Sequence, residues 1–373
     1  MRLRHAYFVL MLLAVGLMQG EARAVDSAAP ALRTRIAQAD ASVQAGSGLP
    51  AKWLETAWDN YKRQFVRAGR VLDDVNKISH SEGQGYAMLI AAKASDRAAF
   101  DEIWNWTRRE LYVDPSDLAA WQWNEKSVPH VKDRNNATDG DILIAWALLE
   151  GGEKWHSAEY VEAARKIVTA LGRNVVVEAA GGTALLPGRN GFSATEQPDG
   201  LVLNLSYWVF PAFERLRGIA PEIDWAAIEA TGMRLIRESR FGPTRLPPEW
   251  IAVGSAGLAP AQAFPSRFSY NAIRIPLYLV WSKKAPRDVL RPFAGLWNEA
   301  LDLGPFEVEL PSGAALDPLG GSGFKAIVAT AKCATDGQKV PTSLLRIGPG
   351  SYYSTTLHIL SLMAIQERYP ECL

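Results

Sequence analysis

The feature that most constrains the fold is a helical period of apolar residues that continues, with few interruptions, from Pro50 to the C-terminus. Apolar side chains recur three and four positions apart, the spacing that places them on one face of an α-helix. Eleven or twelve helices of about 10–17 residues are expected, joined by short connections that contain Gly or Pro. Eleven begin near residues 53, 86, 100, 142, 160, 207, 225, 272, 289, 323 and 354. The chain is therefore predicted to be all-α.

The helices alternate between more apolar and more amphipathic sequences, which predicts a closed double ring, or toroid. Inner helices would be buried on most sides, outer helices would cover them, and loops at one end of the inner helices would form a cleft. A small β-hairpin is predicted where residues 175–177 and 185–186 flank the Gly181-Gly182 turn. No solenoid-type repeat or low-complexity linker divides the chain, so residues 49–373 are predicted to form one domain.

The first 24 residues have the form of a secretory signal peptide. A charged start precedes an apolar stretch at residues 6–18 and the cleavage signal Ala22-Arg23-Ala24. That stretch is shorter than the ~20 residues that cross a bilayer, and no later stretch is long enough, so no membrane insertion is expected. Residues 25–48 are predicted to be a flexible lead-in. The mature protein is predicted to be periplasmic or secreted.

Composition excludes several classes of function. The 373 residues carry 40 basic and 40 acidic side chains without a long run of either sign, which argues against nucleic acid as a partner. The 5 His show no zinc-ligand spacing, and neither a Walker loop nor a G-x-S-x-G motif is present, so no metal or cofactor is expected. In an exported protein Cys333 and Cys372 could form a disulfide or remain free thiols.

Residues 135–150, N-N-A-T-D-G-D-I-L-I-A-W-A-L-L-E, open with turn chemistry and continue as an apolar helix. Thr138 or Asp139 is the expected N-cap, and Asp141 lies in the first turn near the positive end of the helix dipole. Gly140 would let another group approach both carboxylates closely. This pattern predicts two acidic side chains at one rigid helix start. The alternative is that Asp139 only caps the helix.

A second stretch, residues 79–86, reads S-H-S-E-G-Q-G-Y and leads into another helix. Ser79 and Glu82 fit a capping box, which would give Glu82 a structural role. Gly83 and Gly85, however, each cost about 1 kcal/mol relative to Ala in a helix. We therefore favour a functional Glu82, with a bulky ligand lying against the glycine backbone beside it.

Aromatic residues stand beside these acidic positions. They occur in Trp121-Gln122-Trp123, Tyr207-Trp208 and Glu249-Trp250. Flat aromatic rings next to carboxylates suit sugar binding, because the C–H faces of a pyranose stack on the rings while its hydroxyls meet polar groups. The alternative for each aromatic residue is a place in the hydrophobic core.

Both acidic stretches carry a resemblance to glycoside hydrolase family 8. Residues 137–147, A-T-D-G-D-I-L-I-A-W-A, fit every position of the family signature A-[ST]-D-[AG]-D-x-x-[IM]-A-x-[SA]. The S-E-G-Q-G-Y-A-M motif is intact at residues 81–88, and weaker similarities lie at residues 186–192, 204–208 and 352–353. The chain most resembles the periplasmic endoglucanases that accompany bacterial cellulose synthesis, over residues from about 53 to 365.

The resemblance implies an (α/α)6 barrel and an endo-β-1,4-glucanase that hydrolyses cellulose-type glucan with inversion, with a cellulose synthase complex as a further partner. It assigns Glu82 as the general acid, with a pKa that burial must raise. It also assigns Asp139 as the partner that holds the distorted sugar ring or helps to activate water. The candidate substrate-binding residues are Tyr86, Trp121, Asp141, Tyr207, Asn271 and Arg274.

One position departs from the family pattern. Many members carry a water-activating Asp in S-Y-D-A-x-R, whereas residues 269–274 read S-Y-N-A-I-R. An amide is far too weak a base to take a proton from water. Asp139 or Asp141 could then be the base, with Asn271 positioning the water, and we favour this explanation. Otherwise the protein is a glucan binder with little or no activity, or the position has been changed deliberately.

The polymer itself is a further open point. Chitosan or xylan could replace cellulose on the same scaffold. The zero net charge speaks against cationic chitosan, because a cationic polymer favours a strongly acidic cleft.

Overall fold

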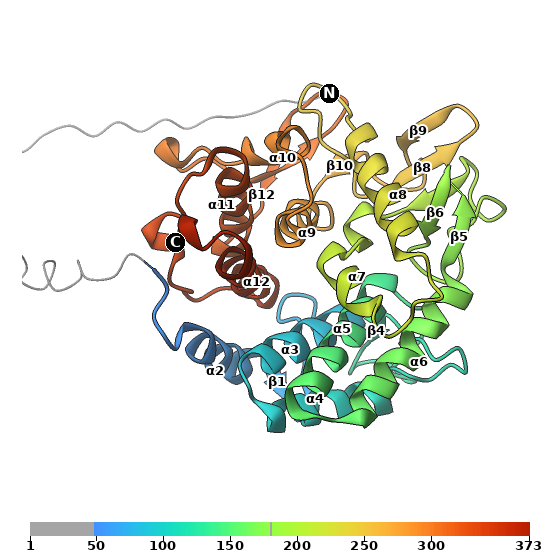
Figure 1. Ribbon diagram of the computed structural model, residues 1–373. Coiled ribbons are helices and arrows are strands. Elements are labelled where there is room, and N and C mark those ends of the chain that lie inside the picture. Colours follow the sequence, from blue (N-terminus) through green and yellow to red (C-terminus); the bar gives the residue numbers. More distant parts are fainter. Residues whose placement is uncertain (1–47, 180) are drawn as a thin grey trace, which may run out of the picture. The chain divides into compact units, whose positions relative to one another are not determined.

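In the computed structural model, which describes residues 48–179 and 181–373, the apolar-periodic segments form eleven α-helices (Figure 1). The predicted signal peptide and all of the predicted lead-in except Gly48 lie outside the described residues. The helices are α2 (Trp53–Phe65), α3 (Ser81–Lys93), α4 (Arg97–Glu110), α5 (Thr138–Trp155), α6 (Ala158–Asn174), α7 (Phe210–Leu216), α8 (Trp225–Glu238), α9 (Arg274–Ser282), α10 (Arg287–Ala294), α11 (Ser322–Asp336) and α12 (Tyr352–Arg368).

Contacts between six of these helices form a closed circuit. α3 packs on α5, α5 on α7, α7 on α9, α9 on both α11 and α12, and α12 returns to α3. α3, α5, α9 and α12 are buried along most of their length, whereas α2, α4, α6, α8 and α10 bury one face and pack on the circuit from outside. The predicted alternation of more and less buried helices holds from α2 to α11 and ends there, because α11 and α12 follow each other and both belong to the circuit. The arrangement is consistent with an (α/α)6 fold.

The short strands form five small antiparallel sheets in the described part of the chain. The predicted hairpin is confirmed: β5 (Val176–Ala179) pairs with β6 (Gly182–Leu185). The other strands were not predicted, because runs of two to four residues are too short to show a period of two. They are β1 (Val66–Arg67), β2 (Arg70–Val71), β3 (Ser79–His80), β4 (Gln122–Trp123), β7 (Leu201–Leu203), β8 (Ile251–Gly254), β9 (Gly257–Pro260), β10 (Arg267–Phe268), β11 (Phe306–Glu309) and β12 (Ala315–Pro318).

Two helix predictions were wrong at their ends. The helix expected from residue 207 begins at Phe210, because the Asn204 side chain caps a separate 3-10 turn and Pro211 suits only a first helical turn. The helix expected over residues 289–301 ends at Ala294. Gly295 follows it, and the Asn298 side chain then caps a second 3-10 turn in place of continued helix.

Glycines allow α3 and α5 to pack closely. A Cβ atom added to Gly85 would lie 2.6 Å from Leu143 Cβ, and one added to Gly140 would lie 2.1 Å from Ser81 Oγ. A Cβ on Gly83 would lie 2.6 Å from the Tyr352 hydroxyl. The expectation of a ligand against these glycines was therefore wrong, because protein atoms fill the space. The close approach instead brings the starts of the two helices together.

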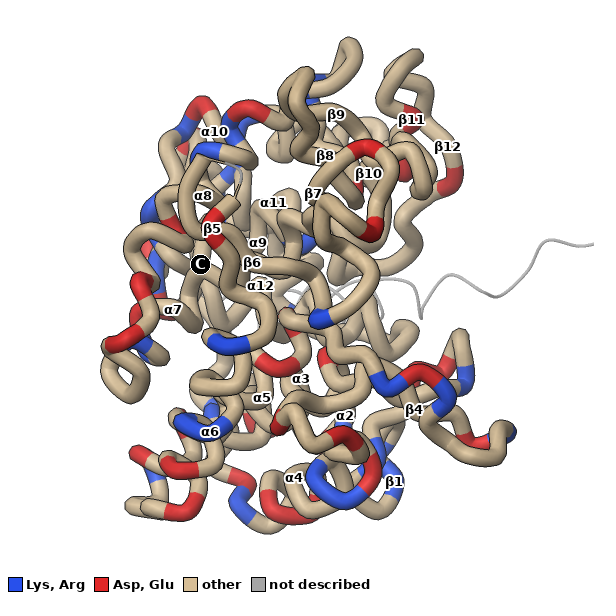
Figure 2. The backbone as a smooth tube through the Cα atoms, turned by 90° about the vertical axis from the view of Figure 1, so that its right-hand side faces the viewer, with Lys and Arg blue, Asp and Glu red and all other residues tan. Residues whose placement is uncertain are grey.

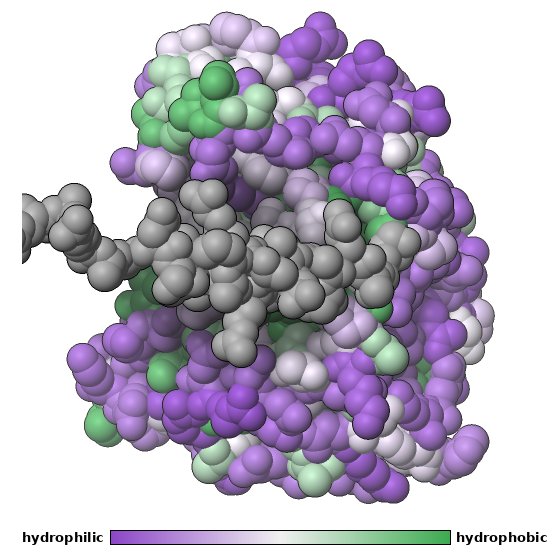
Figure 3. All heavy atoms as spheres, turned by 90° about the vertical axis from the view of Figure 1, so that its left-hand side faces the viewer, coloured by the Kyte–Doolittle hydropathy of each residue, from purple (hydrophilic) through white to green (hydrophobic). Residues whose placement is uncertain are grey.

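Charged side chains of both signs are interspersed along the backbone, as expected for a chain with no net charge (Figure 2). The face seen in Figure 3 is mostly hydrophilic, with an apolar group at its upper left. In the described part of the chain, every helix is too short or too polar to cross a membrane.

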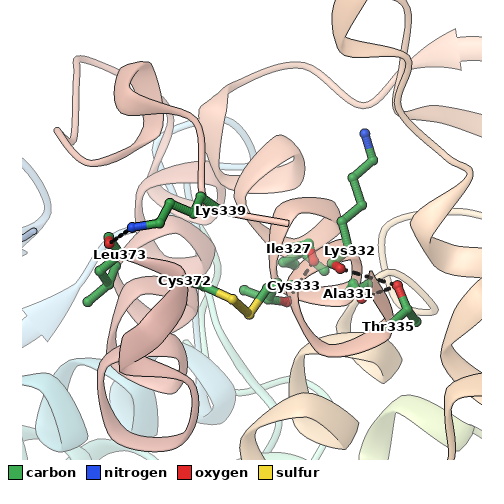
Figure 4. Close-up of a disulfide and its surroundings, with 9 residues drawn as sticks. Ile327, Ala331, Lys332, Cys333, Thr335, Lys339, Cys372 and Leu373 are labelled. Carbon is green, nitrogen blue, oxygen red and sulfur yellow. Dashed lines mark hydrogen bonds between the residues drawn. A yellow bond between two sulfur atoms is a disulfide. The ribbon is translucent and has the colours of Figure 1, made fainter. Parts of the chain in front are cut away.

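A disulfide ties the end of the chain to the helical unit. Cys333 in α11 is bonded to Cys372 in the 3-10 turn Pro370–Cys372 (Figure 4). Backbone and side-chain hydrogen bonds reinforce the link, from Val340 N to Cys372 O and from Lys339 Nζ to Leu373 O. Of the two alternatives for the cysteines, the structure shows the pair.

We expect Cys372→Ser to lower the free energy of unfolding by about 2–4 kcal/mol, because the bond closes a loop of 39 residues in the unfolded chain. Urea denaturation of the oxidised wild type and of the variant measures the difference. A reducing agent should destabilise the wild type to the level of the variant and leave the variant unchanged. Equal stability of the oxidised wild type and the variant would contradict the prediction.

Candidate active site

A cleft of about 660 Å³ opens where several helices of the circuit begin. Glu82 is the second residue of α3, Asn271 precedes α9, and Tyr352 and Tyr353 start α12, and all four line the cleft. The cleft thus lies at the N-terminal ends of the buried helices, where the partial positive charge of each helix favours carboxylates. The prediction of a cleft at one end of the inner helices is confirmed.

Arg274, the first residue of α9, connects the acidic residues of the two motifs. Its Nη1 donates hydrogen bonds to Glu82 Oε1 at 2.8 Å and to Asp139 Oδ2 at 2.6 Å. Its Nη2 donates to Asn271 Oδ1 and to Ser206 Oγ, each at 3.0 Å. The guanidinium is therefore a buried hub whose two terminal nitrogens hold different partners.

This hub limits how far apart Glu82 and Asp139 can lie. Two oxygens that accept hydrogen bonds from one nitrogen are on the order of 4–5 Å apart. Inverting glycosidases separate their acid and base by roughly 6.5–9.5 Å, which leaves room for a water. The two oxygens that Glu82 and Asp139 place on this nitrogen are closer than that. Asn271 lies on the other terminal nitrogen of Arg274.

Asp139 does not cap its helix. The N-cap position of α5 is Ala137, which makes no side-chain cap, and the Thr138 hydroxyl donates to Leu186 O, so the cap prediction was wrong. The Asp139 side chain is 1% exposed. Burial raises its pKa to about 6; Arg274 opposes the rise and the Glu82 charge adds to it. The predicted capping box of Ser79 and Glu82 is wrong as well, because His80 Nδ1 accepts the Gly83 N–H.

Asp141 and Tyr86 lie behind the cleft. Asp141 is fully buried, and its oxygens accept hydrogen bonds from Ala119 N at 2.8 Å and Asn136 Nδ2 at 3.0 Å. Burial raises its pKa to about 7. The Tyr86 hydroxyl bonds to the Tyr278 hydroxyl, and Tyr86 is likewise fully buried. Both candidates are thus hydrogen-bonded to other parts of the protein and do not face the cleft.

The aromatic candidates divide into covered and accessible rings. Trp208 is fully buried and donates to Ile228 O. Trp250 stacks on two rings, Phe192 and Phe264, and is half-buried. Trp121 and Tyr207 remain half-buried; Trp121 donates to Asp133, and the Arg274 guanidinium lies 5.5 Å from the Tyr207 ring centroid. Trp121 and Tyr207 therefore keep exposed surface and are not stacked between other aromatic rings of the described residues.

The family model for glycosyl hydrolases family 8 matches residues 29–367 of the chain. The chain belongs to family 8 of the glycosyl hydrolases. A probable endoglucanase of Novacetimonas hansenii is 36% identical over 315 residues, which are 83% of this chain and 90% of that protein. The Cellulomonas uda endoglucanase is 39% identical over 236 residues, 62% of this chain and 65% of the relative, slightly under two thirds of its length.

Solved structures of the family share the fold. The endo-β-1,4-glucanase of Acetobacter xylinum superposes with a TM-score of 0.77 at 35% identity, covering 85% of this chain and 99% of that chain. The family assigned from the two sequence motifs is therefore confirmed, and the chain is a glycoside hydrolase.

Several residues of this family 8 site were not singled out from the sequence. Ser206 binds Arg274, Tyr353 donates to Tyr270 O, and Glu249 accepts the backbone N–H of Asn271 at 2.7 Å. The sequence offered a signal for Ser206 and Tyr353, because both lie in segments with weaker similarity to the family, residues 204–208 and 352–353. For Glu249 only its position beside Trp250 was noted. In the described residues, no group of three or more His, Cys, Asp or Glu side chains could hold a metal ion.

The raised pKa of Asp139 predicts a pH-dependent contribution to stability. Its pKa is about 6 in the folded protein and near the ordinary 3.8 in the unfolded chain, so the folded state binds the proton more tightly. The resulting stabilisation is fully present below about pH 4 and is lost as the pH rises through 6. Asp139→Asn lacks this group, so its stability relative to wild type should increase between pH 4 and pH 8.

Urea denaturation across that pH range measures this difference. Asp59→Asn, which changes an exposed carboxylate on α2, is the control and should parallel the wild type. A constant difference between Asp139→Asn and wild type at all pH values would contradict the prediction.

Proposed function

We propose that the protein is an endo-β-1,4-glucanase that cleaves cellulose-type glucan with inversion, on an (α/α)6 barrel. The observation that carries the proposal is the shared hydrogen bonding of Glu82 and Asp139 to the buried Arg274 beside an open cleft. These two carboxylates come from the two most specific family motifs. The similarity to the endoglucanases described above supports the reaction class.

In the proposed reaction Glu82 is the general acid. It lines the cleft, and its side chain remains 18% exposed, so it can reach a glycosidic oxygen. Asp139 fixes Arg274 and helps to hold the distorted sugar ring. Asn271, which also lines the cleft, orients the attacking water from the other side of the guanidinium.

Substrate binding is assigned to the accessible rings and to the polar groups of the cleft. Trp121 and Tyr207 are proposed to contact sugar rings, and Tyr270 and Tyr353 contribute further aromatic surface. Arg274 acts mainly by holding the site together, since it is 1% exposed. Asp141 and Tyr86 support the site from behind rather than by touching substrate. Because the cleft is open, it suits an internal segment of a long chain.

We place the protein in the periplasm or outside the cell, in association with cellulose synthesis. The predicted signal peptide and the disulfide both suit an oxidising compartment. A glucanase there can trim glucan emerging from a cellulose synthase complex. Asn271 favours a second candidate, a glucan-binding protein with little activity, because its amide cannot accept a proton from water.

We expect Glu82→Gln to abolish the release of reducing ends from carboxymethylcellulose, because Gln cannot protonate the leaving oxygen. The loss should be about 10²–10⁴-fold in kcat, the usual contribution of a general acid. Binding of cello-oligosaccharides should persist in titration calorimetry. Newly formed ends of wild-type digests should be α-anomers in NMR spectra recorded before mutarotation.

The matched control is Glu162→Gln on α6, where the side chain is 76% exposed. It should keep wild-type activity. Wild-type protein that binds cello-oligosaccharides without cleaving carboxymethylcellulose would favour the glucan-binding alternative. Newly formed β-anomers would contradict inversion.

A further inference from the structure

The site has a general acid but no carboxylate at the position where the family usually activates water. Asn271 Oδ1 accepts a hydrogen bond from Arg274 Nη2 at 3.0 Å, which leaves the amide NH2 as the free end of this side chain. That end can donate to a water and hold it. It cannot take the water's proton, so another group must.

Three nearby carboxylates are poorly placed for this task. Asp139 shares one nitrogen of Arg274 with Glu82, too close for a water across the scissile bond. Asp141 is fully buried with both oxygens bonded. Asp73 lines the cleft, and burial alone would raise its pKa. Bonds from His80 and Asn76 nevertheless hold that pKa well below its ordinary value, which makes it a weak base.

Glu249 remains, and it adjoins Asn271. It lies just before β8, and its Oε1 accepts the backbone N–H of Asn271 at 2.7 Å. Its Oε2 accepts no hydrogen bond from the described part of the chain, and the residue is half-buried. Burial raises the pKa of Glu249; the Asn271 backbone N–H, Arg267 and Arg274 oppose the rise, and Glu307 adds to it. A raised pKa makes a carboxylate a stronger base near neutral pH.

We propose that Glu249 accepts the proton of the attacking water, which the side-chain amide of Asn271 holds in place. This inference rests on the proposed inverting hydrolysis. The water oxygen bonds to the anomeric carbon as the glycosidic C–O bond breaks. One proton of the water passes to the Glu249 carboxylate, and Glu82 gives its proton to the leaving oxygen. Solvent then removes the proton from Glu249 and restores the one on Glu82.

The test compares Glu249→Gln with wild type on carboxymethylcellulose. Gln can still accept the Asn271 N–H, so a merely structural role would survive the change. We expect kcat to fall at least 100-fold while KM and the melting temperature stay near the wild-type values. Adding Asn271→Asp to the Glu249→Gln variant should raise its kcat at least tenfold, because the new Asp supplies a base. Glu309→Gln, an exposed change on β11, is the control and should be fully active.

A second substrate separates the acid from the base. The fluoride of β-cellobiosyl fluoride leaves without a proton, so Glu82→Gln should hydrolyse it, whereas Glu249→Gln should not. Hydrolysis of the fluoride by Glu249→Gln at the wild-type rate would overturn the inference. So would a 100-fold loss in Asp317→Asn, a carboxylate beside the cleft residue Pro318, with Glu249→Gln fully active.

The outcomes also separate this inference from the proposed function. Glu249→Gln activity within threefold of wild type refutes the role of Glu249 and leaves the glucanase intact. A wild type that cleaves nothing refutes both. If Glu249→Gln does not fold, Asn271→Asp alone decides. With a native base at Glu249, that variant should gain no activity over wild type, and a gain of tenfold or more overturns the inference.

Discussion

The site depends on one buried cation. Arg274 is 1% exposed, and a guanidinium removed from water is tolerated only when acceptors surround it. Glu82, Asp139, Asn271 and Ser206 supply them from four separate parts of the chain. Because one positive charge serves two carboxylates, one negative charge stays uncompensated. Burial and the neighbouring Glu82 charge accordingly raise the pKa of Asp139 to about 6, even though Arg274 opposes the rise.

Helix packing brings these partners to one point. Gly85 and Gly140 let α3 and α5 approach until side chain and backbone touch, so Glu82 and Asp139 can reach the same nitrogen atom. Arg274 begins α9, which packs on α7, α11 and α12 of the same circuit. A larger residue at either glycine would push α3 and α5 apart and so move Glu82 and Asp139 away from their shared nitrogen atom. Gly85 and Gly140 are therefore needed both for close helix packing and for the arrangement of the proposed catalytic residues.

The helices and the two acidic motifs could be predicted from the sequence, because an apolar period and a short motif depend only on residues that are close together in the chain. The sequence could not say which members of a motif face the cleft. Asp141 is two residues beyond Asp139, about 200° around the helix, so it points to loops behind the site. Trp250 stands beside Glu249 in the sequence, but only the structure shows that its ring stacks on Phe192 and Phe264. Such outcomes depend on tertiary contacts that no local pattern contains.

Asn271 changes the charge balance of the hub. An Asp at this position would give Arg274 a third carboxylate and leave two negative charges uncompensated in a buried site. With the amide, the attraction of Arg274 is divided between Glu82 and Asp139 alone. Glu249 is a further carboxylate beside Asn271. It accepts the backbone N–H of Asn271 and is not hydrogen-bonded to the guanidinium of Arg274. Arg274 therefore lowers the pKa of Glu249 only through charge attraction, without a hydrogen bond, and burial keeps that pKa raised.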